Sequence, residues 1–340
     1  MIPTPRPPHG KSARDKKPLD KKQADTEETF MQSRKYAWCV ALAGAAMMGG
    51  RSAHAYEAGY PGWSMPPGVV LGMTAATPAP GFYSFNEVYT AQAHRYGPGD
   101  PSSATPIRVA SAVTGVLWTP GWTFFGARYE ALIVQPFTMA DAGAPLNVQS
   151  GGVRNTFIAP VQLSWALGNT GLFVKTGIGV TVPDGTISGP NGLGDPGAPW
   201  WIVQPLLAFS YLKGGWNLTA NFSLEMNTPN TKTEYRTGDI LHADFVATKA
   251  FGKWRVGPVA SYVGQVTNDT SSAFYHNAIN VSSYNLFAVG GLVGYDFGPV
   301  VLNLWATKDV SASASGGNPG PNRATIPKGY KVFANLNFRF

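Results

Sequence analysis

Three histidines are the side chains best suited to acid–base or metal chemistry after residue 55. His94 and His276 lie in or beside loop-like stretches, and the chain has no Gly-x-Ser-x-Gly nucleophile turn. His242 and Asp244 share one face of an extended segment, but a zinc site usually needs three or four ligands. We therefore expect a polar pair at 242 and 244, and no metal. If the protein is an enzyme, the alternative is a lipid hydrolase that uses one of these histidines at the surface of a membrane.

Two further motifs point away from cofactor and thiol chemistry. Cys39 is the only cysteine and lies in a predicted leader, so the mature chain would have no disulfide and no reactive thiol. Gly192, Gly194 and Gly197 have the spacing of a dinucleotide-binding loop. They lie in a Pro-rich stretch that leads into Trp200, whereas such a loop must open a helix. No cofactor is expected.

The N-terminal 55 residues look like targeting sequence. Residues 1–30 are charged, Pro-rich and poor in apolar side chains, which predicts a disordered extension or a mis-assigned start ahead of Met31. Residues 31–55 have the order of a signal peptide: Arg34 and Lys35, an apolar run over 36–48, and small residues at Ala53 and Ala55. We predict cleavage before Tyr56.

Removing the leader also removes most of the net charge. It takes ten of the 26 Lys and Arg and five of the 19 Asp and Glu, so 16 minus 14 leaves +2. A nucleic-acid partner is therefore not expected.

Alternating side chains are the strongest structural signal in the remaining sequence. In 216–227, Trp216, Leu218 and Phe222 alternate with Asn217, Thr219 and other polar residues. A strand puts successive side chains on opposite faces, and a membrane barrel needs one face apolar. The predicted strands are 82–92, 106–118, 122–135, 153–166, 171–182, 199–212, 215–227, 239–251, 253–266, 284–297, 299–309 and 328–340.

The connections between these strands alternate in length. Tight turns near Pro120, Gly168, Gly214, Gly252 and Gly298 alternate with long stretches at 93–105, 136–152, 183–198, 228–238, 267–283 and 310–327. A transmembrane barrel has short periplasmic turns and longer outer loops, and it closes because an open edge in lipid leaves backbone groups unpaired. The predicted fold is an all-β, transmembrane, antiparallel β-barrel of about twelve strands over 81–340, in the outer membrane of a Gram-negative bacterium.

The residues before the barrel, 56–80, are rich in Pro and Gly but also contain Tyr60, Trp63, Met65 and Leu71. We expect this N-terminal segment either to stay in the periplasm or to enter the lumen. Its apolar side chains favour docking over full exposure.

Polar faces that point inward would line the lumen. They place there Arg108, Arg128, Glu130, Arg154, Lys175, Glu225, Asp244 and Arg255. These residues either form ion pairs that fill the barrel or line a path. Glu87 and Lys249 share a face with apolar neighbours, which suggests a bulge or a position near the membrane boundary. Phe173, Trp305 and Phe333 have inward parity, so they form an apolar binding path or pack on the N-terminal segment.

The last strand and the start of the barrel each carry a resemblance. An alternating strand that ends in Phe340 resembles the terminal strand of bacterial outer-membrane proteins, which implies recognition by the assembly machinery. Met65–Gly68, Pro80–Gly81, Phe82, Tyr83 and Glu87–Tyr89 resemble the opening of the outer-membrane β-barrel family of the meta-pathway of phenol degradation. That resemblance implies passive uptake of small hydrophobic, including aromatic, compounds. The alternative is a structural or adhesive barrel that acts through its loops.

Overall fold

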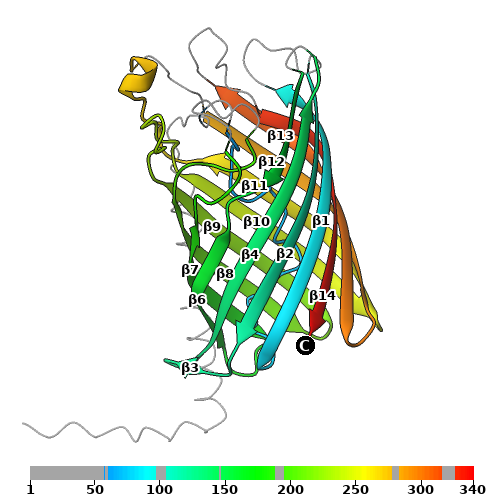
Figure 1. Ribbon diagram of the computed structural model, residues 1–340. Helices are drawn as coiled ribbons and strands as arrows, with labels where there is room; N and C mark the ends of the chain where they lie inside the picture. The colour runs from blue at the N-terminus through cyan, green and yellow to red at the C-terminus, as the bar shows by residue number, and fades with distance from the viewer. Residues whose placement is uncertain are drawn as a thin grey trace, which may run out of the picture. The chain divides into compact units, whose positions relative to one another are not determined.

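A closed antiparallel sheet forms the body of residues 51–340 (Figure 1). The computed structural model describes residues 57, 60–96, 105–144, 147–187, 195–277, 283–315 and 326–340. The predicted leader and its cleavage site lie outside these residues. β1 pairs with β2 on one side and with β14 on the other, so the first and last strands are neighbours. The predicted antiparallel barrel is therefore confirmed.

Twelve wall positions are built from fourteen strand segments in the described ranges. β3 is a two-residue strand in a turn, whereas β5 and β6 both pair with β4 and together form one wall position. The segments are β1 (Gly81–Tyr96), β2 (Pro106–Thr119), β3 (Thr123–Phe124), β4 (Ala127–Ala142), β5 (Val148–Val153), β6 (Phe157–Ala166), β7 (Leu172–Thr181), β8 (Ile202–Lys213), β9 (Trp216–Asn227), β10 (Ile240–Phe251), β11 (Trp254–Gln265), β12 (Ser283–Asp296), β13 (Val300–Ser315) and β14 (Ile326–Arg339). A short 3-10 helix, η1 (Ala273–Tyr275), follows β11. No helix in the described ranges is long and apolar enough to cross a bilayer.

The two faces of the wall differ as the alternation predicts. In β9, Asn217, Thr219 and Glu225 are buried inside the barrel, whereas Trp216 and Leu218 are exposed on the outside. In β14, Lys331, Phe333 and Asn335 are buried, while Tyr330, Val332 and Leu336 are exposed. Apolar side chains on the outside meet lipid, and polar side chains inside need partners within the barrel.

Short turns and long loops lie at opposite ends, but one predicted strand begins in the wrong place. The segment 122–135 was expected to be continuous, yet Thr123–Phe124 pairs back on Ala127–Arg128. Phe125 and Gly126 form the tip, with φ of 52° and 78°. The wall strand β4 therefore starts at Ala127 and continues to Ala142, which shortens the predicted loop 136–152.

The wall is interrupted between β5 and β6, at residues 154–156. Here side chains replace part of the ladder: Gln135 Nε2 donates to the Arg154 carbonyl at 2.8 Å, and the Thr156 N–H donates to Asp184 Oδ1 at 2.8 Å. The interruption lets Arg154 reach the interior of the barrel, where it contacts the N-terminal segment.

Candidate functional site

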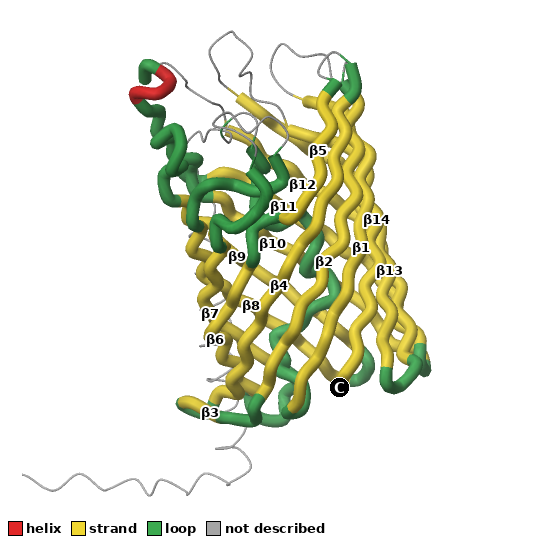
Figure 2. The backbone as a smooth tube through the Cα atoms, in the orientation of Figure 1, coloured by secondary structure: helices red, strands yellow, loops and turns green. Residues whose placement is uncertain are grey.

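The N-terminal segment runs through the interior of the barrel (Figure 2). The Glu57 N–H donates to Thr237 Oγ1 in a long loop, and Arg339 Nη2 at the turn end donates to the Pro80 carbonyl. The segment therefore extends from the loop end of the barrel to its turn end, inside the wall. We call residues 60–80 the luminal segment.

At the loop end, Glu57 fixes the start of this path. Its carboxylate accepts hydrogen bonds from Asn230 Nδ2 at 2.7 Å, Thr233 Oγ1 at 2.7 Å and the Tyr275 hydroxyl at 2.6 Å. Burial raises the pKa of Glu57, and these donors partly offset that effect. Two loops are thereby joined to the chain that enters the lumen.

Glu225 holds the middle of the luminal segment. It accepts hydrogen bonds from the Ser64 backbone at 3.0 Å, the Ser64 hydroxyl at 2.6 Å and the Met65 N–H at 3.2 Å. His242 Nε2 lies 2.8 Å from Glu225 Oε1, and Arg154 Nη2 donates to the Trp63 carbonyl at 2.7 Å. Asp244 accepts hydrogen bonds from the N–H groups of Gly68 and Val70.

The lower half is held in the same way. The Ala75 N–H donates to Ser210 Oγ at 2.8 Å, while Ser164 Oγ donates to the Ala75 carbonyl at 2.5 Å. Arg128 donates to the carbonyls of Thr77 and Pro78. An irregular segment buried away from water must find partners for its backbone groups, and here the polar inner wall supplies them.

These contacts give several predicted lumen residues a specific role. Arg128, Arg154, Glu225 and Asp244 bind the backbone of the luminal segment. Glu130 and Lys175 instead form an ion pair within the wall, with Nζ and Oε1 2.5 Å apart. Ion pairing within the barrel was expected for the charged lumen residues, but it describes only some of them.

The inward aromatic residues Trp305 and Phe333 pack on the luminal segment. Their rings are stacked, with centroids 5.0 Å apart, and both belong to a buried cluster with Leu71 and Tyr89. Trp305 Nε1 also donates to the Gly68 carbonyl at 3.0 Å. Phe173 and Arg255 have inward parity, but both lie near the turn end and neither lines the cavity described next.

One sequence-based placement was wrong, and the two residues that fitted their strands poorly, Glu87 and Lys249, differ from each other. Arg108 was placed in the lumen, but it is exposed on the outer face of β2, because Ser111 and Val113 are the buried residues of that strand. Glu87 does share a face with Phe85 and Tyr89, yet that face points inward and all three side chains are buried. Lys249 points outward at the turn end, where its Nζ donates to the Gly214 carbonyl.

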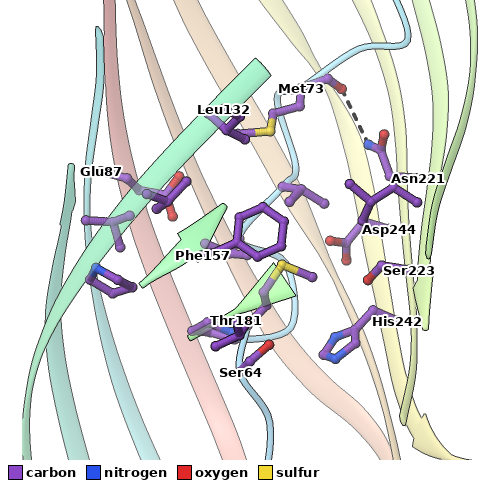
Figure 3. Close-up of a pocket in the computed structure, with 18 of the residues that line it drawn as sticks. Ser64, Met73, Glu87, Leu132, Phe157, Thr181, Asn221, Ser223, His242 and Asp244 are labelled. Atoms are coloured by element: carbon purple, nitrogen blue, oxygen red, sulfur yellow. Dashed lines mark hydrogen bonds between the residues drawn. The ribbon is translucent and has the colours of Figure 1, made fainter. Parts of the chain in front are cut away.

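A cavity of about 450 Å³ lies between the luminal segment and the wall. Met65 and Met73 line it from the segment, and Phe85, Leu132 and Phe157 line it from the wall. Figure 3 shows Met73 and Leu132 together at one end of the cavity, and Phe157 between Glu87 on one side and Asp244 on the other. Its surface is therefore mostly apolar.

A few polar atoms also face this cavity. One carboxylate oxygen each of Glu87, Glu130 and Asp244, and the Ser223 hydroxyl, have no hydrogen-bond partner in the described part of the chain. Apolar walls with a few polar groups are typical of sites for small molecules. No group of three or more potential metal ligands occurs among the described residues.

Glycines set the width of this cavity. A Cβ atom on Gly115 would lie 2.2 Å from Phe85 Cζ, and one on Gly179 would lie 2.4 Å from Phe157 Cε2. An edge of each ring therefore lies against a glycine of the neighbouring strand, where a larger residue would collide with it. Sequence reasoning did not single out these pairs, because only the strand register brings Phe85 opposite Gly115.

The fold and the interior together define this protein as an outer-membrane β-barrel with twelve wall positions. Its lumen holds its own N-terminal segment and an apolar cavity. Residues 93–320 match the model of the family described as "Putative MetA-pathway of phenol degradation", and the chain belongs to that family. The match covers most of the barrel, from the end of β1 to a point beyond β13, and not residues 65–89, on which the sequence resemblance was noted.

One solved structure supports the fold, and two more distant ones were also found. The COG4313 outer membrane channel from Pseudomonas putida F1 is similar with a TM-score of 0.65 and 12% identity, over 78% of this chain and 97% of that one. The transport unit of the autotransporter AIDA-I from Escherichia coli gives a TM-score of 0.44 and 9% identity, over 79% and 92%. A variant of the monoaromatic hydrocarbon channel TodX gives 0.39 and 10%, over 85% and 94%. The comparison with curated proteins found no match.

Proposed function

We propose that this protein is an outer-membrane channel through which small hydrophobic compounds, aromatic ones among them, cross by passive diffusion. The observation that carries the proposal is the apolar cavity inside a closed membrane barrel, which Phe85 and Phe157 line from the wall. Membership of a family named for phenol degradation, and a fold like that of an outer-membrane channel, support the same proposal.

The luminal segment makes the path narrow. It occupies the centre of the barrel and is hydrogen-bonded to the wall along its length, so a solute would pass beside it. A barrel of twelve strands lies between the filled eight-stranded barrels and the aqueous channels of sixteen or more. The proposed channel therefore selects small, weakly hydrated molecules.

We infer that the protein does not catalyse a reaction. His94 points outward on β1, His242 points inward beside Glu225, and His276 is exposed after η1. Within the described residues, no serine hydroxyl is hydrogen-bonded to any of them. We also propose that Phe340, which is 76% exposed at the end of the terminal strand, is the residue that the assembly machinery recognises.

Uptake into asymmetric vesicles tests the channel proposal. Vesicles with lipid A in the outer leaflet slow the entry of hydrophobic solutes, so a contribution from the protein becomes measurable. We expect the mature protein to accelerate entry of toluene and phenol but not of glucose. A correctly folded barrel that accelerates none of them would favour a structural or adhesive role, and lipid turnover would favour a hydrolase.

A further inference from the structure

Cations gather on the outer face of the barrel, near its loop end. Lys308 on β13 is the register partner of Tyr330 on β14, and Tyr330 is also the register partner of Gln92 on β1. Gln92 in turn is the register partner of Arg108 on β2. Lys308, Tyr330, Gln92 and Arg108 are all exposed. They thus form one row across four neighbouring strands.

A third cation extends this row. Lys328 is half-buried two residues from Tyr330 on the same face of β14, and its register partner is the exposed His94. The Nζ atoms of Lys308 and Lys328 lie 5.2 Å from the ring centres of Tyr330 and Tyr96, respectively. We call Arg108, Lys308 and Lys328 the outer basic patch.

The patch lies at the height of the outer membrane boundary. Counted from the turn end, Lys308 is the ninth residue of β13 (300 to 308), and Arg108 and Lys328 are the twelfth of β2 (119 to 108) and β14 (339 to 328). A tilted strand advances about 2.5 Å per residue along the membrane normal, so about ten residues cross the apolar band of ~25 Å. These cations therefore sit where lipid headgroups begin.

Protein groups neutralise the patch only in part. The ion pairs of the described residues involve none of its three cations. Among the described residues, the acidic neighbour is Asp141, the register partner of Arg108, whose Oδ1 accepts a hydrogen bond from Gln149 Nε2 at 3.3 Å. Arg108, Lys308, Lys328 and Asp141 together carry a formal charge of three minus one, or +2.

We propose that the outer basic patch binds the phosphate groups of a phosphorylated glycolipid of the lipid A type in the outer leaflet. Arginine matches phosphate with a bidentate fork, and lysine does so as a point charge. Three strand spacings separate Lys308 from Arg108, or about 14 Å. A disaccharide with a phosphate at each end spans such a distance, whereas a single glycerophosphate does not.

Lipid binding to the purified mature protein in nonionic detergent tests this site, with native mass spectrometry as the readout. The variant Arg108→Gln/Lys308→Gln/Lys328→Gln removes the patch. Each cation near an anionic lipid surface contributes about fivefold in affinity, so we expect diphosphoryl lipid A to bind on the order of 100-fold more weakly. Monophosphoryl lipid A should show a smaller difference between wild type and variant.

A matched control removes three lysines at the opposite rim, in the variant Lys213→Gln/Lys249→Gln/Lys253→Gln, and should bind diphosphoryl lipid A like wild type. Heat-modifiable migration in gels shows that each variant is folded. Equal weakening in both triple variants would overturn the proposal, because any loss of charge would then suffice. Equally tight binding of phosphatidylglycerol to the wild type would also overturn it.

Discussion

The substitution Gly115→Ala should narrow the proposed path without changing a polar side chain. The new Cβ would lie 2.2 Å from Phe85 Cζ and 2.3 Å from Cε1, with the Ile133 carbonyl oxygen at 3.0 Å. Apolar atoms need about 3.5 Å, so the Phe85 ring must move by about 1.3 Å, and the cavity is the open side. Overpacking of this kind costs ~1–3 kcal/mol.

That strain sets the size of the expected effect. A solute that passes must press the displaced ring back toward the wall, so an added barrier of ~1–3 kcal/mol slows passage roughly 5- to 150-fold. The assay is the rate of toluene entry into asymmetric vesicles. Phe85→Leu in the Gly115→Ala background should recover most of the rate, because the smaller side chain leaves room for the new methyl group.

Gly291→Ala is the control for this experiment. Gly291 is on the exposed face of β12, and a Cβ there would meet only the Gly257 carbonyl oxygen, at 3.9 Å. Its entry rate should equal that of wild type. If folded Gly115→Ala protein also admitted toluene at the wild-type rate, the path beside Phe85 would be refuted.

Three further predictions address the luminal segment, the loops and assembly. Glu225→Leu removes the acceptor of charge-assisted hydrogen bonds worth ~1.5–3 kcal/mol each. Hydrogen exchange at the Ser64 amide should therefore accelerate at least tenfold, while the amides of the barrel strands stay protected. Unchanged exchange at Ser64 would contradict the anchoring role of Glu225. Burial raises the pKa of Asp269 to about 7 from its ordinary value of 3.8, although the hydrogen bond from the Tyr235 hydroxyl opposes this rise. The buried arrangement of Asp269 is therefore most stable below pH 4 and loses stability as pH rises through 7. The rate of amide hydrogen exchange in loop residues 230–238, corrected for intrinsic rates, should rise between pH 4 and pH 7 in wild type and stay constant in Asp269→Asn. A constant rate in wild type would contradict this role of Asp269. Deletion of Phe340 should lower the amount of heat-modifiable barrel in the outer membrane, while Phe340→Tyr retains it; equal amounts in both would exclude recognition of the aromatic end.

The strands could be predicted because lipid and lumen impose opposite demands on successive residues. β9 and β14 follow that rule along their length, and Trp216 and Tyr330 face outward as expected. The turn at Phe125 escaped prediction because its tip has no Asn, and Gly126 alone gives a weak signal for a left-handed pair.

The interior was harder to predict because its residues serve a segment distant in the sequence. The charges of Glu225 and Arg154 could be placed inward from parity alone. Their partners could not, since Ser64 and Trp63 have no periodic pattern that fixes their depth in the barrel. Arg108 was misplaced because the alternation of β2 is weak, with small residues such as Ala110 and Ala112 on its outer face.

Photolabelling with a small aryl diazirine tests most directly whether an aromatic molecule enters the barrel. The protein is labelled in lipid vesicles, and the modified residues are mapped by mass spectrometry with and without toluene as competitor. We expect toluene-sensitive labels on Met73, Phe85 and Leu132 inside the barrel, besides labels on the lipid-facing wall. Labels confined to outward residues such as Val88 and Val332, with the cavity unlabelled, would contradict it.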